Sequence, residues 1–162
     1  MYNDNLEFTG GKDKVTQHEI WEEYCEKYDI DKSISYEAWQ FGDKADELAE
    51  LVCMGIKTAT CSLAAVYEFE PDEPEPKVDD ISIILNSADE AVCIIRNIKV
   101  YTAPFCDITA EHAFKEGEGD RSLSYWRQVH KDFFRKEAEE YGISFHENSN
   151  VICEEFEVLY RA

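Results

Sequence analysis

The chain has 162 residues, 44% of them hydrophobic, and contains nine Phe, nine Tyr and three Trp residues. This length and aromatic content predict one globular domain and exclude a disordered chain. Thirty-six acidic residues against sixteen basic ones give a formal net charge of −20, which argues against binding to a long nucleic-acid duplex. A small local pocket for one nucleotide or nucleoside stays compatible with this charge, because counterion release scales with the number of phosphates contacted.

Cysteine spacing and hydropathy argue against further classes of protein. The six cysteines, at positions 25, 53, 61, 93, 106 and 153, form no CxxC pair and no Cys/His cluster of the kind that binds zinc. We therefore expect neither a metal nor a cofactor. The first 14 residues lack the apolar segment of a signal peptide, and no apolar run approaches the roughly 20 residues that span a bilayer. The sequence predicts a cytoplasmic protein without membrane contact.

The N-terminal part predicts an arm and a helix. Residues 1–15 show no periodic pattern and include two adjacent glycines, so we expect a flexible arm there. Thr16 and Glu19 have the spacing of a capping box, in which each residue satisfies the backbone N–H of the other. Apolar residues at helical spacing follow, which predicts a helix to about residue 29.

A strand and a second helix are predicted next. Trp39 and Phe41 alternate as in a short strand, and their rings form either ordinary core or the wall of a site for a flat ligand. Asp43 is expected to cap a helix with one apolar face. This helix leads to Gly55.

The stretch from Gly55 to Ser62 reads Gly-Ile-Lys-Thr-Ala-Thr-Cys-Ser and joins the helical pattern to a strand pattern. Glycine adopts the left-handed conformation that ends a helix without steric cost, so the chain can turn at Gly55 and present Lys57 on a loop. On a regular strand Lys57 and Thr60 would point to opposite faces, so they converge only if Lys57 precedes the strand. A helix end with a solvated lysine is the alternative interpretation.

The second half of the chain predicts strands, an acidic loop and two helices. Residues 63–70 are compatible with a helix, and the proline-rich acidic residues 71–80 predict an exposed loop. Ile- and Val-rich segments predict a β-hairpin. The remaining predicted elements are hairpin strands at 81–87 and 91–101, a short helix beginning at Thr109, a long helix from Ser122 to Gly142, and a last strand at 151–160.

One acidic run stands between the two predicted helices. Residues 116–120 read Glu-Gly-Glu-Gly-Asp, and glycine allows a carboxylate to point inward from a non-helical turn. A calcium-type loop and a simple acidic turn are alternatives, but few further oxygen ligands lie nearby in the sequence.

The order of these elements, together with four short motifs, resembles the larger bacterial branch of the ASCH domain, a member of the PUA-like superfamily. The matching motifs are WQFGD at 39–43, GIKTATCS at 55–62, EGEGD at 116–120 and WRQVHKDFF at 126–134. The resemblance implies an α+β fold, a PUA-like mixed β-barrel of about five or six strands surrounded by helices. Because it begins near Tyr36, we predict an N-terminal arm and added helix in residues 1–35 and the ASCH domain in residues 36–162.

The resemblance implies a site for RNA or a nucleoside beside the GxK turn. A hydrolytic branch that deacetylates acetylated cytidine carries a similar lysine, threonine and glutamate, and by that match Lys57 is a base, Thr60 a nucleophile and Glu116 a positioning or proton-shuttling carboxylate. The general ASCH motif has an acidic residue at Thr60 and an arginine at Ser62, so this chain departs from it in its ligand contacts. Further expected ligand contacts are Trp39, Phe41, Thr58, Ser62, Trp126, Arg127 and His130.

The chemistry of these residues leaves two roles open for Lys57. A lysine acts as a base only when its pKa is lowered, whereas a nearby carboxylate such as Glu116 favours the charged ammonium. Lys57 therefore either sits in a dry site or supplies a positive charge that stabilises an oxyanion. The alternative is a structural ion pair that braces the cleft.

Three functions follow from this pattern. The first is binding of RNA or a nucleoside, in which Lys57 and Arg127 meet a phosphate and Trp39 or Trp126 stacks on a base. The second is hydrolysis of a modified nucleoside, or ribonuclease activity, with His130 as a further acid–base candidate. The third is a non-catalytic protein-interaction domain whose acidic surface recruits a basic partner.

Overall fold

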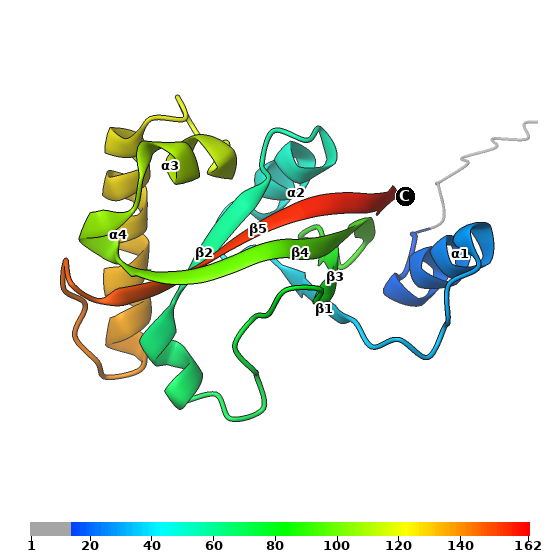
Figure 1. Ribbon diagram of the computed structural model, residues 1–162, viewed down its shortest axis with the longest axis horizontal. Coiled ribbons are helices and arrows are strands. Elements are labelled where there is room, and N and C mark those ends of the chain that lie inside the picture. The colour runs from blue at the N-terminus through cyan, green and yellow to red at the C-terminus, as the bar shows by residue number, and fades with distance from the viewer. Residues whose placement is uncertain (1–13) are drawn as a thin grey trace, which may run out of the picture.

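The computed structural model describes residues 14–162 and shows a mixed α+β fold, in which a five-stranded sheet curls into a half-barrel with four α-helices around it (Figure 1). The α+β, PUA-like fold class is confirmed. Most of the predicted arm, residues 1–13, lies outside the described residues. The elements are α1 (Gln17–Tyr28), β1 (Glu37–Gln40), α2 (Ala45–Cys53), β2 (Ala59–Leu63), β3 (Ile81–Leu85), β4 (Ala91–Pro104), α3 (Ala110–Glu116), α4 (Leu123–Glu140) and β5 (Asn150–Arg161), with 3₁₀ turns at Ala64–Glu68 and Phe105–Asp107.

The sheet is organised around two long strands. Its order is β1-β3-β4-β5-β2, with β1 parallel to β3 and every other pairing antiparallel. The predicted hairpin is therefore β3–β4, and the predicted last strand is β5. The β4–β5 register shifts between Ile94 and Ile95 and again between Asn97 and Lys99. Such irregularities bend a strand and increase its twist, which accounts for the curled shape of this ribbon (Figure 1).

Helix α1 packs near one end of the β4–β5 ribbon (Figure 1). The predicted capping box is present, because the Thr16 side chain accepts from the Glu19 N–H while the Glu19 carboxylate accepts from the Thr16 N–H. Ile20 and Trp21 then point into a cluster with residues of β3 and β4, among them Ile94. This apolar stripe attaches the helix to the sheet.

Helices α3 and α4 pack near the other end of the ribbon (Figure 1). Their shared core includes Phe105, Trp126 and Phe134, which are at most 2% exposed. The predicted caps are confirmed, since Thr109 accepts from the His112 N–H and Ser122 accepts from the Tyr125 N–H. These two helices bring two of the motifs named above, at residues 116–120 and 126–134, to the side of the sheet that contains β2.

Helix α2 delivers the chain to the glycine turn. The prediction that Asp43 caps this helix is wrong: Lys44 occupies the cap position in a left-handed conformation, with no side-chain hydrogen bond. The C-terminal prediction is confirmed. Gly55 has φ of 72°, its N–H bonds to the Val52 carbonyl, and the Ile56 N–H bonds to the Leu51 carbonyl. This pair of bonds is the Schellman arrangement, which reverses the chain directly after the helix.

The loop at residues 71–80 is exposed, as predicted. Nine of the ten residues in 71–80 are exposed, and Pro76 is half-buried. Within residues 14–162, no helix has the length and apolar character needed to cross a membrane.

Candidate functional site

Lys57 is the buried cation at the centre of the site. The Schellman turn places it before β2 begins at Ala59, as the convergence argument requires. Its side chain is 1% exposed, and its ammonium donates to Glu116 Oε2 at 3.2 Å, to Glu118 Oε1 at 2.9 Å and to the Glu116 carbonyl at 3.4 Å. All three ammonium protons therefore have acceptors.

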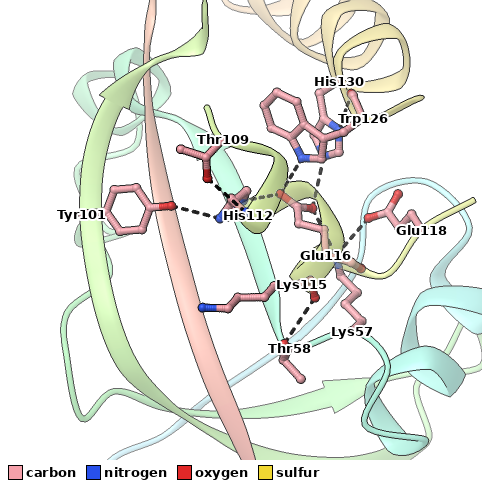
Figure 2. A network of polar contacts seen from close by, with 10 residues as sticks. All are labelled: Lys57, Thr58, Tyr101, Thr109, His112, Lys115, Glu116, Glu118, Trp126 and His130. Carbon is pink, nitrogen blue, oxygen red and sulfur yellow. Dashed lines mark hydrogen bonds and ion pairs between the residues drawn. The ribbon is translucent and has the colours of Figure 1, made fainter. Parts of the chain in front are cut away.

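Glu116 is the anion to which the other polar groups converge (Figure 2). It is the last residue of α3 and is also 1% exposed. Its Oε1 accepts from Trp126 Nε1 at 2.8 Å and lies 2.7 Å from His112 Nε2. Its Oε2 lies 3.2 Å from both Lys57 Nζ and His130 Nε2. The carboxylate thus has four polar neighbours drawn from the Gly55 turn, α3 and α4.

Two histidines hydrogen-bond to the Glu116 carboxylate. His130 Nδ1 lies 2.9 Å from the Trp126 carbonyl, which can only accept, so Nδ1 must hold a proton. Its Nε2 faces the Glu116 carboxylate, which also only accepts, and this favours the imidazolium form. His112 Nε2 faces the other oxygen of the same carboxylate and donates to it, and His112 Nδ1 lies 3.2 Å from the Tyr101 hydroxyl.

The pKa shifts of the ionisable groups in the site follow from this geometry. Burial by itself lowers the pKa of Lys57, but the carboxylates of Glu116 and Glu118 outweigh it and the net shift is upward. Burial works to raise the pKa of Glu116, yet Lys57 and His130 hold it well below its ordinary value of 4.5. For His130, burial lowers the pKa and Glu116 raises it, with a net rise above 6.5. The site is therefore two cations interleaved with two carboxylates.

The loop after α3 is held close to the Gly55 turn. Gly117 has φ of 75°, and a Cβ there would lie 2.7 Å from the Ile56 carbonyl oxygen. A side chain would be strained at this φ and would also collide with backbone. The Arg121 guanidinium adds hydrogen bonds to the carbonyls of Phe114 and Ile56. This close approach is what carries Glu116 and Glu118 to Lys57.

A cleft with two chambers lies over this network. The lysine chamber, about 420 Å³, is lined by Phe41, Gly42, Asp43, Lys44, Leu48, Lys57, Thr60, Cys61, Glu116, Glu118, Tyr125, Val129, His130, Asp132, Phe133 and Lys136. The acidic chamber, about 470 Å³, is lined by Glu37, Ala38, Trp39, Gln40, Phe41, Gly42, Thr60, Cys61, Ser62, Tyr67, Glu73, Pro74, Pro76, Asp80, Ser82, Asn97, Phe133, Glu137 and Glu154. The two chambers share Phe41, Gly42, Thr60, Cys61 and Phe133, so they are parts of one depression.

The structure gathers most of the predicted site residues in this cleft. Lys57, Glu116 and His130 line the lysine chamber, whereas Trp39 and Ser62 line the acidic chamber. The predicted residues common to both chambers are Phe41 and Thr60. Within residues 14–162 the Thr60 hydroxyl makes no hydrogen bond, and it lies at the junction of the chambers.

Three predicted contacts lie elsewhere. Trp126 is 2% exposed, with its ring stacked 5.2 Å from Phe105 on one side and 4.3 Å from His130 on the other. Its ring is thus occupied by protein, and the residue positions Glu116 instead of presenting a face to a base. Arg127 is exposed and donates to the Cys106 carbonyl outside both chambers. Thr58 hydrogen-bonds to the Lys115 carbonyl through its backbone N–H and its hydroxyl (Figure 2).

Sequence reasoning missed two members of the network. His112 precedes Glu116 by four residues on α3, and this i, i+4 spacing on one helix face was a usable signal. Glu118 follows Glu116 by two residues, and only the tertiary approach to Lys57 reveals its role.

One group could in principle hold a metal ion. Ligand atoms of Cys61, Glu116 and His130 lie within 4.8 Å of one another. Burial and the charge of Glu116 raise the pKa of the Cys61 thiol well above 9.0, which disfavours the thiolate that binds metals. Both Glu116 oxygens are already engaged, Oε2 by Lys57 and Oε1 by Trp126. This arrangement suits an ion-pair network better than a metal centre.

Comparisons with known proteins agree with this fold. The family model of the ASCH domain matches residues 37–160. The crystal structure of an ASCH domain from Lactobacillus crispatus JV V101 is 30% identical, covering 96% of this chain and all of that one, with a TM-score of 0.78. A protein from Enterococcus faecalis V583, assigned to the family DUF984, is 32% identical over 88% of this chain and 86% of that one, with a TM-score of 0.80. No curated protein matches the chain.

Proposed function

The chain belongs to the ASCH domain family, and from this premise we propose that it binds a single nucleoside, or the nucleoside end of an RNA fragment, in the cleft beside the Gly55 turn. One observation carries this proposal: aromatic side chains line a depression that also contains a buried array of fixed charges. Trp39, Phe41 and Phe133 line the chambers, and Lys57, Glu116 and His130 form the charge array.

A nucleoside suits both halves of this arrangement. Its base offers a flat face for stacking on aromatic rings, and its edges carry hydrogen-bond donors and acceptors. Each chamber, at about 420 Å³ and about 470 Å³, is of the size usual for small-molecule sites. The Thr60 hydroxyl lies at their junction and is free to donate to or accept from the ligand.

Long RNA suits the cleft less well than one nucleoside. The ammonium of Lys57 is already bound by two carboxylates, so it has no free proton for a phosphate. The other basic lining residues, Lys44 and Lys136, are exposed, and Asp43 and Asp132 line the same chamber. Together with the net charge of −20, this leaves little attraction for a polyphosphate backbone.

Calorimetric titration of the full chain with cytidine, cytidine monophosphate and a short RNA oligomer tests the proposal. We expect saturable nucleoside binding that Trp39→Leu weakens, since loss of one base–aromatic stack costs about 1–3 kcal/mol, or about 5- to 150-fold in Kd. Arg127→Ala is the matched control, because Arg127 lies outside both chambers. Failure of every nucleoside to bind, or an equal loss in Arg127→Ala, would contradict the proposal.

Hydrolysis of an acylated nucleoside is the second candidate, and the position of Thr60 favours it. Its hydroxyl is unpartnered within residues 14–162 and lies in the same chamber as Lys57, Glu116 and His130. The resting site nevertheless offers no ready base, because Lys57 is held in its charged form and Glu116 is saturated with donors. Hydrolysis therefore requires the ligand to rearrange this network, with Lys57 and His130 acting as positive charges beside a developing oxyanion.

Release of cytidine from acetylated cytidine, followed by chromatography, tests this candidate. Activity that falls at least 100-fold in both Thr60→Ala and Lys57→Met, but not in Arg127→Ala, is the expected result for an enzyme. The same assay with an RNA oligomer tests ribonuclease activity. Binding of nucleoside without turnover would leave binding as the function.

A further inference from the structure

The acidic chamber has a one-sided charge that the nucleoside proposal does not use. Its lining includes Glu37, Glu73, Asp80, Glu137 and Glu154, and among residues 14–162 none that lines it is Lys, Arg or His. Carboxylates in a concave site are normally paired with a cation, because burial penalises an isolated charge.

Two of these carboxylates are built into the protein without a counter-charge. Glu137 Oε2 is buried and has no hydrogen-bond partner, the one such side-chain atom in the part of the chain that the structure describes. Burial, and secondarily Glu140, raises the pKa of Glu137. Burial also raises the pKa of Glu154, which accepts a hydrogen bond from Asn97 at 2.8 Å but makes no ion pair within residues 14–162.

The same chamber has aromatic side chains. Trp39 and Phe133 line it together with Tyr67, whose hydroxyl is 3.0 Å from that of Ser62. Aromatic faces attract ammonium groups through the ring quadrupole and also pack against an aliphatic chain. Carboxylates combined with aromatic rings are the chemistry that recognises an organic cation.

A single metal ion does not fit this chamber. In residues 14–162, the only group of three potential ligands within 4.8 Å of one another is Cys61, Glu116 and His130. The carboxylates of the acidic chamber are therefore too widely spaced to coordinate one ion, which needs its ligands at about 2–2.6 Å. Widely spaced negative charges match a ligand whose own positive charges are spread along a chain.

We propose that the acidic chamber binds an aliphatic ammonium ion, with Glu137 and Glu154 as its charge partners and Trp39 against its methylene chain. Two sources share this chemistry: a free polyamine and a nucleoside that carries an amine-bearing substituent. Trp39 is also the stacking residue of the nucleoside proposal, but the charge partners Glu137 and Glu154 are not part of it, so the amine proposal does not depend on nucleoside binding. The shared residues Phe41, Thr60 and Phe133 would, however, let one amine-bearing nucleoside occupy both chambers.

Calorimetric titration of the full chain with spermidine at about 0.15 M salt tests the proposal, because surface attraction is largely screened there. We expect Glu137→Gln to weaken binding roughly tenfold or more through loss of a charge-assisted hydrogen bond. Glu139→Gln is the matched control: it removes the same charge two residues along the same helix, from an exposed position, and is expected to change Kd less than twofold. Glu137→Gln should not unfold the protein, because it removes the charge from a carboxylate whose buried Oε2 has no hydrogen-bond partner within residues 14–162.

A second titration distinguishes the two sources. N4-(3-aminopropyl)cytidine is compared with N4-propylcytidine, which differs in the ammonium group alone. Glu137-dependent binding of spermidine identifies a polyamine site, and an advantage of the amine-bearing nucleoside that Glu137→Gln abolishes identifies a substituent site. Absence of both, or equal losses in Glu137→Gln and Glu139→Gln, would overturn the proposal. Neither result depends on whether unmodified cytidine binds, so failure of the nucleoside proposal would be seen separately.

Discussion

Glu116→Gln is expected to lower the free energy of unfolding by about 3–5 kcal/mol, the usual cost of breaking a buried ion pair by removing one partner. The wild-type carboxylate neighbours polar hydrogens of Lys57, His112, Trp126 and His130. An amide of the same shape turns two N–H donors toward some of these groups and removes the negative charge between two cations. The loss is large against the 5–15 kcal/mol that typically stabilises a domain.

Urea denaturation at pH 7 measures this effect. Glu111→Gln is the matched control, because Glu111 lies on the same helix, is 78% exposed and pairs with Lys115 across a single turn. That change should cost no more than about 0.5 kcal/mol. A loss in Glu116→Gln no greater than in the control would show that the network does not stabilise the fold.

Lys57→Met is expected to cost a similar 3–5 kcal/mol at neutral pH, because it leaves Glu116 buried without its ammonium partner. This loss depends on pH. The wild-type pKa of Glu116 is depressed, so its contribution to stability is present above its ordinary value of 4.5 and is lost only as the pH falls through the low folded value. In the variant, Glu116 is still buried but has lost one of its positively charged neighbours, so its pKa should be higher than in the wild-type protein.

The sign of the variant's pH dependence follows. A higher pKa means that Glu116 in the variant takes up a proton at a higher pH, and protonation removes the cost of its unpaired buried charge. The difference in free energy of unfolding between wild type and Lys57→Met should therefore narrow as the pH falls from 7 toward 4. We expect narrowing of about 1 kcal/mol or more, since each pKa unit corresponds to about 1.4 kcal/mol. Urea titrations at pH 7, 6, 5 and 4 measure it. A gap that is constant over this range would mean that Glu116 keeps its depressed pKa without Lys57.

The double variant Lys57→Met, Glu116→Gln measures how much of the stabilisation comes from the contact between these two residues. Removing both partners should lower the free energy of unfolding by less than the sum of the two single losses, because the double variant leaves neither residue of the pair as an unpaired buried charge. If the two single losses add up to the loss in the double variant, then His112, Trp126 and His130 contribute most of the stabilisation of Glu116.

Much of the fold was predictable because its signals are local. The Thr16–Glu19 capping box, the glycine that ends α2 and the serine that begins α4 each act within one helical turn. Alternating or continuous apolar runs in the same way indicated β3, β4 and β5. The Asp43 cap failed although Asp is a favoured N-cap residue, because the left-handed backbone of Lys44 moved the start of α2 one residue further along the chain.

The candidate site was predictable in part. The position of Lys57 before β2 followed from helix termination and strand alternation, and the resemblance indicated Thr60 and Glu116. The role of Glu118 was invisible because it depends on Gly117 approaching the Ile56 carbonyl closely, a contact between distant segments. Trp126 looked like a ligand contact because an aromatic residue on an amphipathic helix does not reveal which of its faces is already covered.

By itself, the sequence determined the order of helices and strands, the sharp turn at Gly55 and the acidity that disfavours long nucleic acid, because each depends on neighbouring residues or on totals. The tertiary structure alone decided that Lys57 is charged and buried between two carboxylates, and that beside it lies a second chamber for which the described part of the chain provides no basic lining residue. Protonation and pocket shape depend on distances between segments that are far apart in the chain, such as Lys57 and Glu118, which are 61 residues apart, and no local pattern encodes those distances.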